Sequence, residues 1–245
     1  MSGTLPEGTQ PNQGYPLVSF NSRQWLVIVA VVVVVAAGLT FYFVSRQEAV
    51  VIESTTEPSA GAVAERADSG DALMVAGPLG EMTLGDPNAP NVVIEYASMT
   101  CPHCQRFHTQ VFPALKEKYI DTGRAYFIFR EFPLDPLATS AIMLARCAPK
   151  ENFFPMVDLL FQQQATWAFV QEPVTALRDL VKQAGISADS FQACLTNQEI
   201  LDGVNWVKTR ASTEFDVGST PTFFFNGQMH PGEIPLEEID GYLGG

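Results

Sequence analysis

The stretch VVIEYASMTCPHC, residues 92–104, holds the features that decide the fold of this chain. It opens with a short, apolar and β-branched segment, Val92 to Tyr96, of the kind that forms a buried strand. Two cysteines separated by Pro102 and His103 follow it. Beyond them, apolar residues recur every four positions, which predicts an amphipathic helix. We therefore expect a strand that leads into a CxxC motif at a helix N-terminus.

The residues after this helix predict a second strand and then a helical region. Pro113 should kink the helix, because proline lacks the N–H that a helix interior needs. Residues 125–132 read as a second central strand, joined to the first through the helix in a βαβ unit. Residues 136–216 show helical patterns alone, with helix starts at Asp135 and Ser187. An all-helical segment is thus inserted into an α/β domain.

Strand character returns near the end of the chain. Residues 221–225 read as a strand, which the Asn226-Gly227 turn signal ends, and a short helix is expected over residues 236–243. The predicted order is β-α-β, helices, β-turn and α. A chain of 245 residues is long enough for one such domain with appendages.

An uncharged apolar run precedes this domain. Residues 25–44 contain no charged side chain over 20 positions, enough for a transmembrane helix. A cleaved secretory signal is the alternative, although its apolar region is usually shorter. We expect a short N-terminal tail over residues 1–24, a flexible linker over residues 45–80, which is rich in small and polar residues, and the catalytic domain over residues 81–245.

The cysteines, rather than the charges, predict on which side of the membrane the domain lies. Arg23 and Arg46 flank the span, so the positive-inside rule gives no orientation. All four cysteines follow the span, which fits an oxidising compartment. We expect a single-pass protein of the inner (cytoplasmic) membrane with its domain on the periplasmic, extracytoplasmic side. The net charge of −13 makes nucleic acid an unsuitable partner.

The CxxC motif predicts reversible thiol-disulfide exchange. At a helix N-terminus, Cys101 would lie outside the first turn, open to solvent, where the helix dipole stabilises a thiolate. Cys104, further inside, would resolve a mixed disulfide. His103 can give a hydrogen bond or positive charge to the thiolate, which makes the disulfide a stronger oxidant. Pro102 completes the motif, which favours an oxidase over a reductase.

A lone CxxC can also be half of a zinc site. The chain has no second CxxC and no paired histidines at zinc-like spacing, so we expect no metal, and no cofactor. His108 and His230 are interpreted as ordinary surface or core residues. His103 alone is given a role, because it lies inside the motif; the alternative is that it is a neutral surface residue, the commoner case for a single histidine.

Three stretches together resemble the DsbA-like thiol oxidases. They are residues 93–104, residues 218–222 (Gly-Ser-Thr-Pro-Thr) and Asn226-Gly227, and the resemblance spans about residues 80 to 245. The resemblance implies a thioredoxin fold with an inserted helical domain, which agrees with the helical pattern of residues 136–216. The fold class we predict is α/β, a thioredoxin fold with this insertion, after a transmembrane helix and a flexible stalk.

The resemblance also implies roles for three residues outside the CxxC. Glu95, six positions before Cys101, matches a partly buried acid that aids proton transfer at Cys104; the alternative is an ordinary polar residue at a strand edge. Pro221 matches the family's cis-proline beside the disulfide, against the alternative of a trans proline at a strand start. Thr220 would then contact the substrate peptide.

Cys147 and Cys194 lie in the helical region, 47 positions apart. A structural disulfide between two helices is our prediction for this pair, because the expected compartment is oxidising. The alternative is that both are small buried side chains that never pair. The resemblance permits the bridge without requiring it, since only some relatives carry a second disulfide.

The sequence therefore predicts an enzyme, a protein thiol-disulfide oxidoreductase. As an oxidase it would give its Cys101–Cys104 disulfide to reduced exported proteins, and the resemblance implies that a quinone-linked membrane partner reoxidises it. A reductase or isomerase could use the same two cysteines. A redox-inactive binder of unfolded exported chains is a third hypothesis, against which the intact CxxC weighs.

Overall fold

The computed structural model of the protein describes residues 72–244. The predicted tail (residues 1–24), the predicted span (residues 25–44) and most of the predicted linker lie outside this part. Within residues 72–244, no helix has both the length and the apolar character that crossing a membrane requires.

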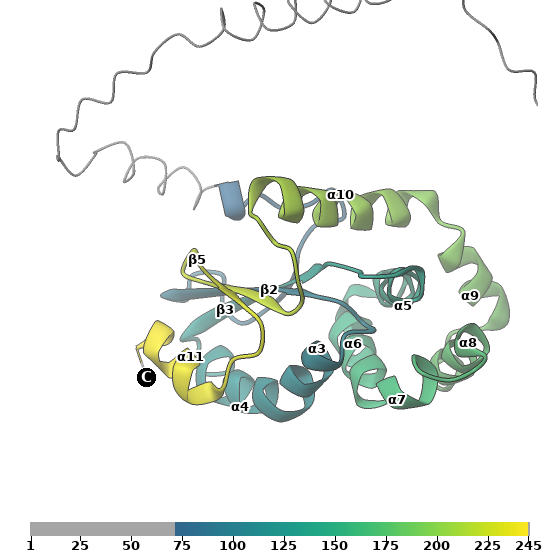
Figure 1. Ribbon diagram of the computed structural model, residues 1–245, viewed down its shortest axis with the longest axis horizontal. Helices are drawn as coiled ribbons and strands as arrows, with labels where there is room; N and C mark the ends of the chain where they lie inside the picture. The colour runs from purple at the N-terminus through teal and green to yellow at the C-terminus, as the bar shows by residue number, and fades with distance from the viewer. Residues whose placement is uncertain (1–71, 245) are drawn as a thin grey trace, which may run out of the picture. The chain divides into compact units, whose positions relative to one another are not determined.

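A five-stranded mixed sheet forms the centre of the described part (Figure 1). The strands are arranged in the order β1-β3-β2-β4-β5, with β2 and β3 parallel and the other neighbours antiparallel. Their bounds are β1 Met82–Leu84, β2 Asn91–Ala97, β3 Ala125–Glu131, β4 Thr222–Phe225 and β5 Gln228–Pro231. The predicted strands are present. Neither edge strand was predicted from its residues: β1 has only three residues, and β5 follows the Asn226-Gly227 turn.

The predicted all-helical insertion is confirmed between β3 and β4. Its elements are α5 Pro136–Cys147, the short 3-10 helix η3 Lys150–Asn152, α6 Phe153–Gln162, α7 Gln164–Trp167, α8 Pro173–Gln183, α9 Ala188–Leu195 and α10 Gln198–Glu214. Both expected caps form. The Asp135 carboxylate accepts the N–H of Ala138 at 2.8 Å, and the Ser187 hydroxyl accepts that of Ser190 at 3.1 Å. These bonds satisfy N–H groups that have no partner inside the helix.

The helical segment after the CxxC has wider turns than expected. It is divided into α3 Pro102–Arg106, the π-helical η1 Phe107–Val111, α4 Phe112–Leu115 and the π-helical η2 Lys116–Ile120. Pro113 lies in the first turn of α4, where its missing N–H breaks the α-helical ladder. The predicted kink is thus a local change to π-helical bonding, such as the bond from the N–H of Phe112 to the carbonyl of Phe107.

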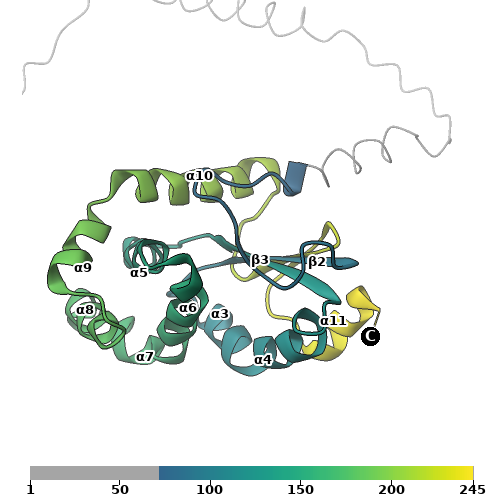
Figure 2. The ribbon, with the colours of Figure 1, turned by 180° about the vertical axis from the view of Figure 1, so that it is seen from behind.

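Helices cover both faces of the sheet, and alternation along β2 divides its side chains between them (Figures 1 and 2). Ile94 and Tyr96 face α10 on one side. Val93 and Ala97 face the other side, in the larger core with the helical segment after the CxxC, the inserted helices and α11 Leu236–Leu243. Since side chains alternate along a strand, Glu95 points into this larger core.

The predicted linker is too long at its C-terminal end. Residues 72–80 pack on the domain, and Leu73 is only 4% exposed. The Arg130 guanidinium donates to the carbonyl of Leu73 at 2.7 Å, and Arg210 donates to that of Ala72 at 2.6 Å. The composition of residues 72–80 gave no sign of order, because their partners come from distant parts of the chain.

Candidate active site

The CxxC lies where the sequence placed it, at the start of α3. Cys101 is the N-cap residue, with extended backbone angles, and Pro102 occupies the first helical position. Both cysteines of the motif are thiols in the structure. Cys101 is less open to solvent than predicted, since it is 4% exposed. The Thr220 carbonyl, 3.2 Å from Cys101 Sγ, contributes to this cover.

The surroundings of Cys101 favour its thiolate. A hydrogen bond from the Cys104 thiol, with smaller contributions from the Thr220 side chain and the backbone N–H groups of Cys104 and His103, lowers the pKa of Cys101 to about 5. Burial acts in the opposite direction but is outweighed. Hydrogen bonds to a charged sulfur stabilise the ion relative to the neutral thiol. At neutral pH, Cys101 is therefore ionised.

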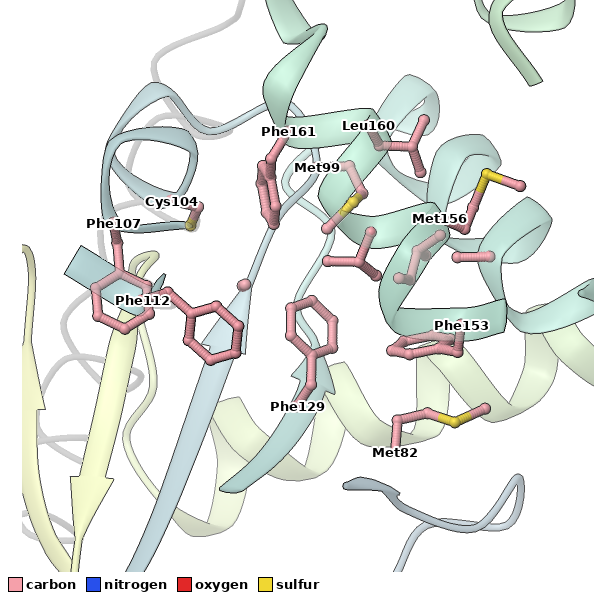
Figure 3. Packing of buried hydrophobic residues seen from close by; sticks show 14 of the residues in the cluster. Met82, Met99, Cys104, Phe107, Phe112, Phe129, Phe153, Met156, Leu160 and Phe161 are labelled. Atoms are coloured by element: carbon pink, nitrogen blue, oxygen red, sulfur yellow. The ribbon is translucent and has the colours of Figure 1, made fainter. Parts of the chain in front are cut away.

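Cys104 is in the opposite situation. Its side chain is fully buried beside aromatic rings of the larger core, including Phe107, Phe112 and Phe161 (Figure 3). Burial, the hydrogen bond with Cys101 and the negative charge of Glu95 raise the pKa of Cys104 well above its ordinary value. Cys104 therefore remains a thiol at neutral pH, and it must lose its proton before it can attack another sulfur.

Glu95 and His108 form a buried pair behind Cys104. The Glu95 side chain is fully buried and that of His108 is 1% exposed, and Glu95 Oε2 lies 2.9 Å from His108 Nε2. The imidazole stacks on Phe161 with the ring centroids 4.3 Å apart. The resemblance implied Glu95, but His108 was interpreted as an ordinary residue. Its spacing was a signal, because His108 lies four residues after Cys104 and thus on the same helix face.

The His103 side chain does not take the role that was predicted for it at the Cys101 thiolate. Its Nδ1 lies 2.9 Å from Glu233, which also pairs with Arg106 at 2.6 Å, and this cluster lies at the surface. The contribution of His103 to the Cys101 thiolate is made by its backbone N–H. Glu233 comes from the loop between β5 and α11, which the sequence gave no reason to place beside the CxxC.

The loop before β4 lies against the CxxC, as predicted. The Thr220–Pro221 peptide bond is cis, and the Thr220 carbonyl faces Cys101 Sγ. On another side, the Gln164 amide donates to the carbonyls of Met99 and Cys101 at 2.8 and 3.0 Å. The sequence analysis missed Gln164, because only the folded chain brings α7 to the segment between β2 and α3.

The second pair of cysteines forms a disulfide. Cys147 and Cys194 are joined with their Cα atoms 5.8 Å apart, and the bond links the end of α5 to α9. Residues 72–244 contain no cluster of three or more His, Cys, Asp or Glu side chains suited to a metal ion.

The CxxC lies at a helix N-terminus on a mixed α/β sheet, with one ionised and one buried thiol beside a cis-proline loop. This is an arrangement of the thioredoxin fold that suits thiol-disulfide exchange. Comparison with known proteins agrees. Residues 79–244 match the thioredoxin family, and the chain belongs to that family.

Relatives of known sequence are named as protein-disulfide oxidoreductases. A Rickettsia conorii protein named as a protein-disulfide oxidoreductase is 36% identical over 164 residues, which are 65% of this chain and 57% of that protein. A Rickettsia typhi protein of the same name is 35% identical over 148 residues, covering 60% of this chain and 55% of its own. The chain thus spans a little over half the length of these curated relatives.

Solved structures agree with this assignment. Alpha-DsbA1 of Wolbachia pipientis has a TM-score of 0.66 and 33% identity, covering 71% of this chain and 94% of that chain. BdbD of Bacillus subtilis, with a TM-score of 0.59, 21% identity and coverage of 67% and 94%, shares the fold.

Proposed function

We propose that the protein is a thiol-disulfide oxidase that gives its Cys101–Cys104 disulfide to reduced exported proteins. The observation that carries this proposal is the difference between the two thiols. The pKa of Cys101 is about 5, whereas that of Cys104 is raised well above its ordinary value. A stable Cys101 thiolate stabilises the reduced protein, so the disulfide readily accepts electrons.

The reaction would proceed by two exchanges. A substrate thiolate attacks Cys101 Sγ, the Cys101–Cys104 bond breaks, and Cys104 leaves as a thiolate that takes up a proton. A second substrate thiol, after losing its proton, then attacks the substrate sulfur of the mixed disulfide. Cys101 leaves as a thiolate, so the substrate is oxidised by two electrons and the enzyme is reduced by two. Thr220, opposite Cys101, would hold the substrate backbone during these steps.

The cellular setting is part of the proposal. The uncharged run over residues 25–44 would anchor the protein in the inner membrane, with residues 81–245 on the periplasmic side. The Cys147–Cys194 disulfide supports an oxidising compartment, where such bonds persist. A quinone-linked membrane partner would reoxidise Cys101 and Cys104, and a tether would raise the frequency of that encounter.

The reduction potential of the full chain tests the direction of electron flow. We expect equilibration with glutathione to give a potential well above that of thioredoxin, which is about −270 mV. The oxidised protein should also form disulfides in a reduced model protein. The Cys101→Ser variant should lose this activity, and the matched double variant Cys147→Ala/Cys194→Ala should retain it.

A potential near about −270 mV would overturn the oxidase proposal in favour of a reductase. Failure of the oxidised protein to oxidise any reduced model protein, with peptide binding intact, would identify a redox-inactive binder instead. The anchor is tested separately. Alkaline extraction of cell membranes should leave the full chain in the pellet and release a variant that lacks residues 25–44.

A further inference from the structure

The buried Glu95–His108 pair has a free atom at each end. Glu95 Oε2 and His108 Nε2 are bonded to each other at 2.9 Å. The two remaining polar atoms, Glu95 Oε1 and His108 Nδ1, are buried and have no hydrogen-bond partner among residues 72–244. A buried polar atom without a hydrogen-bond partner destabilises the folded state, so a functional reason for it is expected.

The inner end of this pair acts on Cys104. Glu95 is close enough for its charge to contribute to the raised pKa of the Cys104 thiol. The outer end lies toward α6. His108 stacks on Phe161 of that helix, and Asp158 is three residues earlier, on the same helix face.

Asp158 connects this region with the surface. It lines an open pocket of about 610 Å³, together with Lys116 and Phe112, and the ring of Phe112 also packs on His108 with centroids 4.9 Å apart. Burial raises the pKa of Asp158, while the charges of His108 and Lys116 act in the opposite direction. His108 therefore lies between Glu95 and an acidic group that solvent reaches.

Two titratable groups interact with His108 directly: Glu95 on β2 is hydrogen-bonded to it, and Asp158 on α6 is close enough for the charge of His108 to act on its pKa. Each of these has a further neighbour, Cys104 on α3 beside Glu95 and Lys116 on η2 beside Asp158. The remaining contacts of the imidazole are aromatic.

We propose that His108 passes protons between Glu95 and the Asp158 pocket, so that Cys104 can gain and lose its proton inside the core. The inference rests on the proposed function and extends it to a residue that does not touch the reacting sulfurs. His108 acts through Glu95, as a positioning residue. An imidazole suits this task, because one ring nitrogen can accept a proton while the other releases one.

When Cys104 leaves as a thiolate, a protonated Glu95 gives it a proton and becomes the carboxylate whose charge acts on the Cys104 thiol. Before the next turnover, Glu95 takes up a proton at Oε2 from His108 Nε2–H, and His108 regains a proton at Nδ1 from the Asp158 side. When Cys104 must attack, the same transfers run in reverse, and the proton leaves through Asp158 to water.

The test follows the second of two thiol reactions of the full chain. The protein is reduced with one equivalent of dithiothreitol, a titration confirms two thiols, and it is mixed rapidly with Ellman's disulfide. In the first phase the Cys101 thiolate attacks the reagent, and one thionitrobenzoate is released. In the second phase Cys104 loses its proton and attacks Cys101 Sγ. This attack forms the Cys101–Cys104 disulfide and releases the second thionitrobenzoate.

His108→Gln is the informative variant, since its amide can still donate to Glu95 but cannot carry a proton. We expect its second phase to be slower by about 10-fold or more at pH 7, because positioned acid-base groups commonly accelerate proton transfer at least that much. The first phase, the reduction potential and the unfolding midpoint should match those of the unchanged protein. An unchanged second phase overturns the proposal.

Two further variants keep the test decisive. The double variant Glu95→Gln/His108→Gln should have a second phase no slower than that of the slower single variant, because both residues serve the same proton route. If the two rate reductions multiply in the double variant, the shared route is refuted. If His108→Gln does not fold, the rate of the second phase in Asp158→Asn tests the proposal instead. Its second phase should slow, while Glu151→Gln, which changes another carboxylate of the same pocket, should not.

An unchanged second phase in Asp158→Asn overturns the route. The oxidase proposal is tested independently by the reduction potential and by oxidation of a model protein, so the two ideas can fail separately.

Discussion

Replacing Cys104 by alanine tests the cause of the low pKa of Cys101. At pH 7, a thiol with a pKa of about 5 has a thiolate-to-thiol ratio of about 100. Compared with an ordinary thiol, which is protonated at this pH, this ionisation stabilises the reduced protein by about 2.7 kcal/mol. At about 30 mV for each 1.4 kcal/mol, this is about 60 mV toward a stronger oxidant than the same centre with an ordinary thiol. The largest contribution comes from the Cys104 hydrogen bond.

Loss of that bond should raise the pKa of Cys101. A hydrogen bond to a charged group contributes about 1.5–3 kcal/mol, so Cys104→Ala should have a Cys101 pKa between about 6 and 7. The thiolate fraction at pH 6 would then fall from about nine tenths to between about one tenth and one half. Cys104→Ser is the matched control, because its hydroxyl can still donate to Cys101.

The assay is the pH dependence of thiolate absorbance and of the rate of alkylation by iodoacetamide. Both variants leave Cys101 as the one free thiol, since Cys147 and Cys194 are paired. A pKa that stays at about 5 in Cys104→Ala would refute the hydrogen-bond explanation and assign the effect to the backbone N–H groups. A pKa above about 7 in the unchanged protein would refute the oxidase argument itself.

Three further predictions concern stability. Because the folded pKa of Cys101 is depressed from 9.0 to about 5, its stabilisation of the reduced protein is full above pH 9 and lost toward pH 5. The difference in unfolding free energy between reduced and oxidised protein should therefore grow over this range; a difference independent of pH would contradict this. Replacing Cys147 and Cys194 by alanine should lower the unfolding free energy by about 2–4 kcal/mol in denaturant titrations, as loop entropy for 47 residues implies, and a loss below about 1 kcal/mol would contradict it. Arg146→Met leaves the Glu131 carboxylate buried without its partner, at a cost of about 3–5 kcal/mol, and adding Glu131→Leu should recover most of the loss; no recovery would show that packing, not charge, is responsible.

The regular elements were predictable because their causes are local. The β-branched run before the CxxC, the cap at Asp135 and the Asn226-Gly227 turn each act within a few residues, and each lies in the predicted element. The edge strand β1 and the packing of residues 72–80 were not predictable, because both depend on partners from distant parts of the chain, such as Arg130.

The site divides in the same way. The sequence by itself determined that Cys101 begins a helix after a buried strand, since the motif and its apolar spacing are continuous in the chain. Only the tertiary structure decided that Gln164 donates to the carbonyl of Cys101, that Glu233 holds the His103 side chain, and that His108 joins Glu95 in the core. The physical reason is that the reactivity of these thiols depends on burial, charge and hydrogen bonds from other elements, which exist only after those elements pack together.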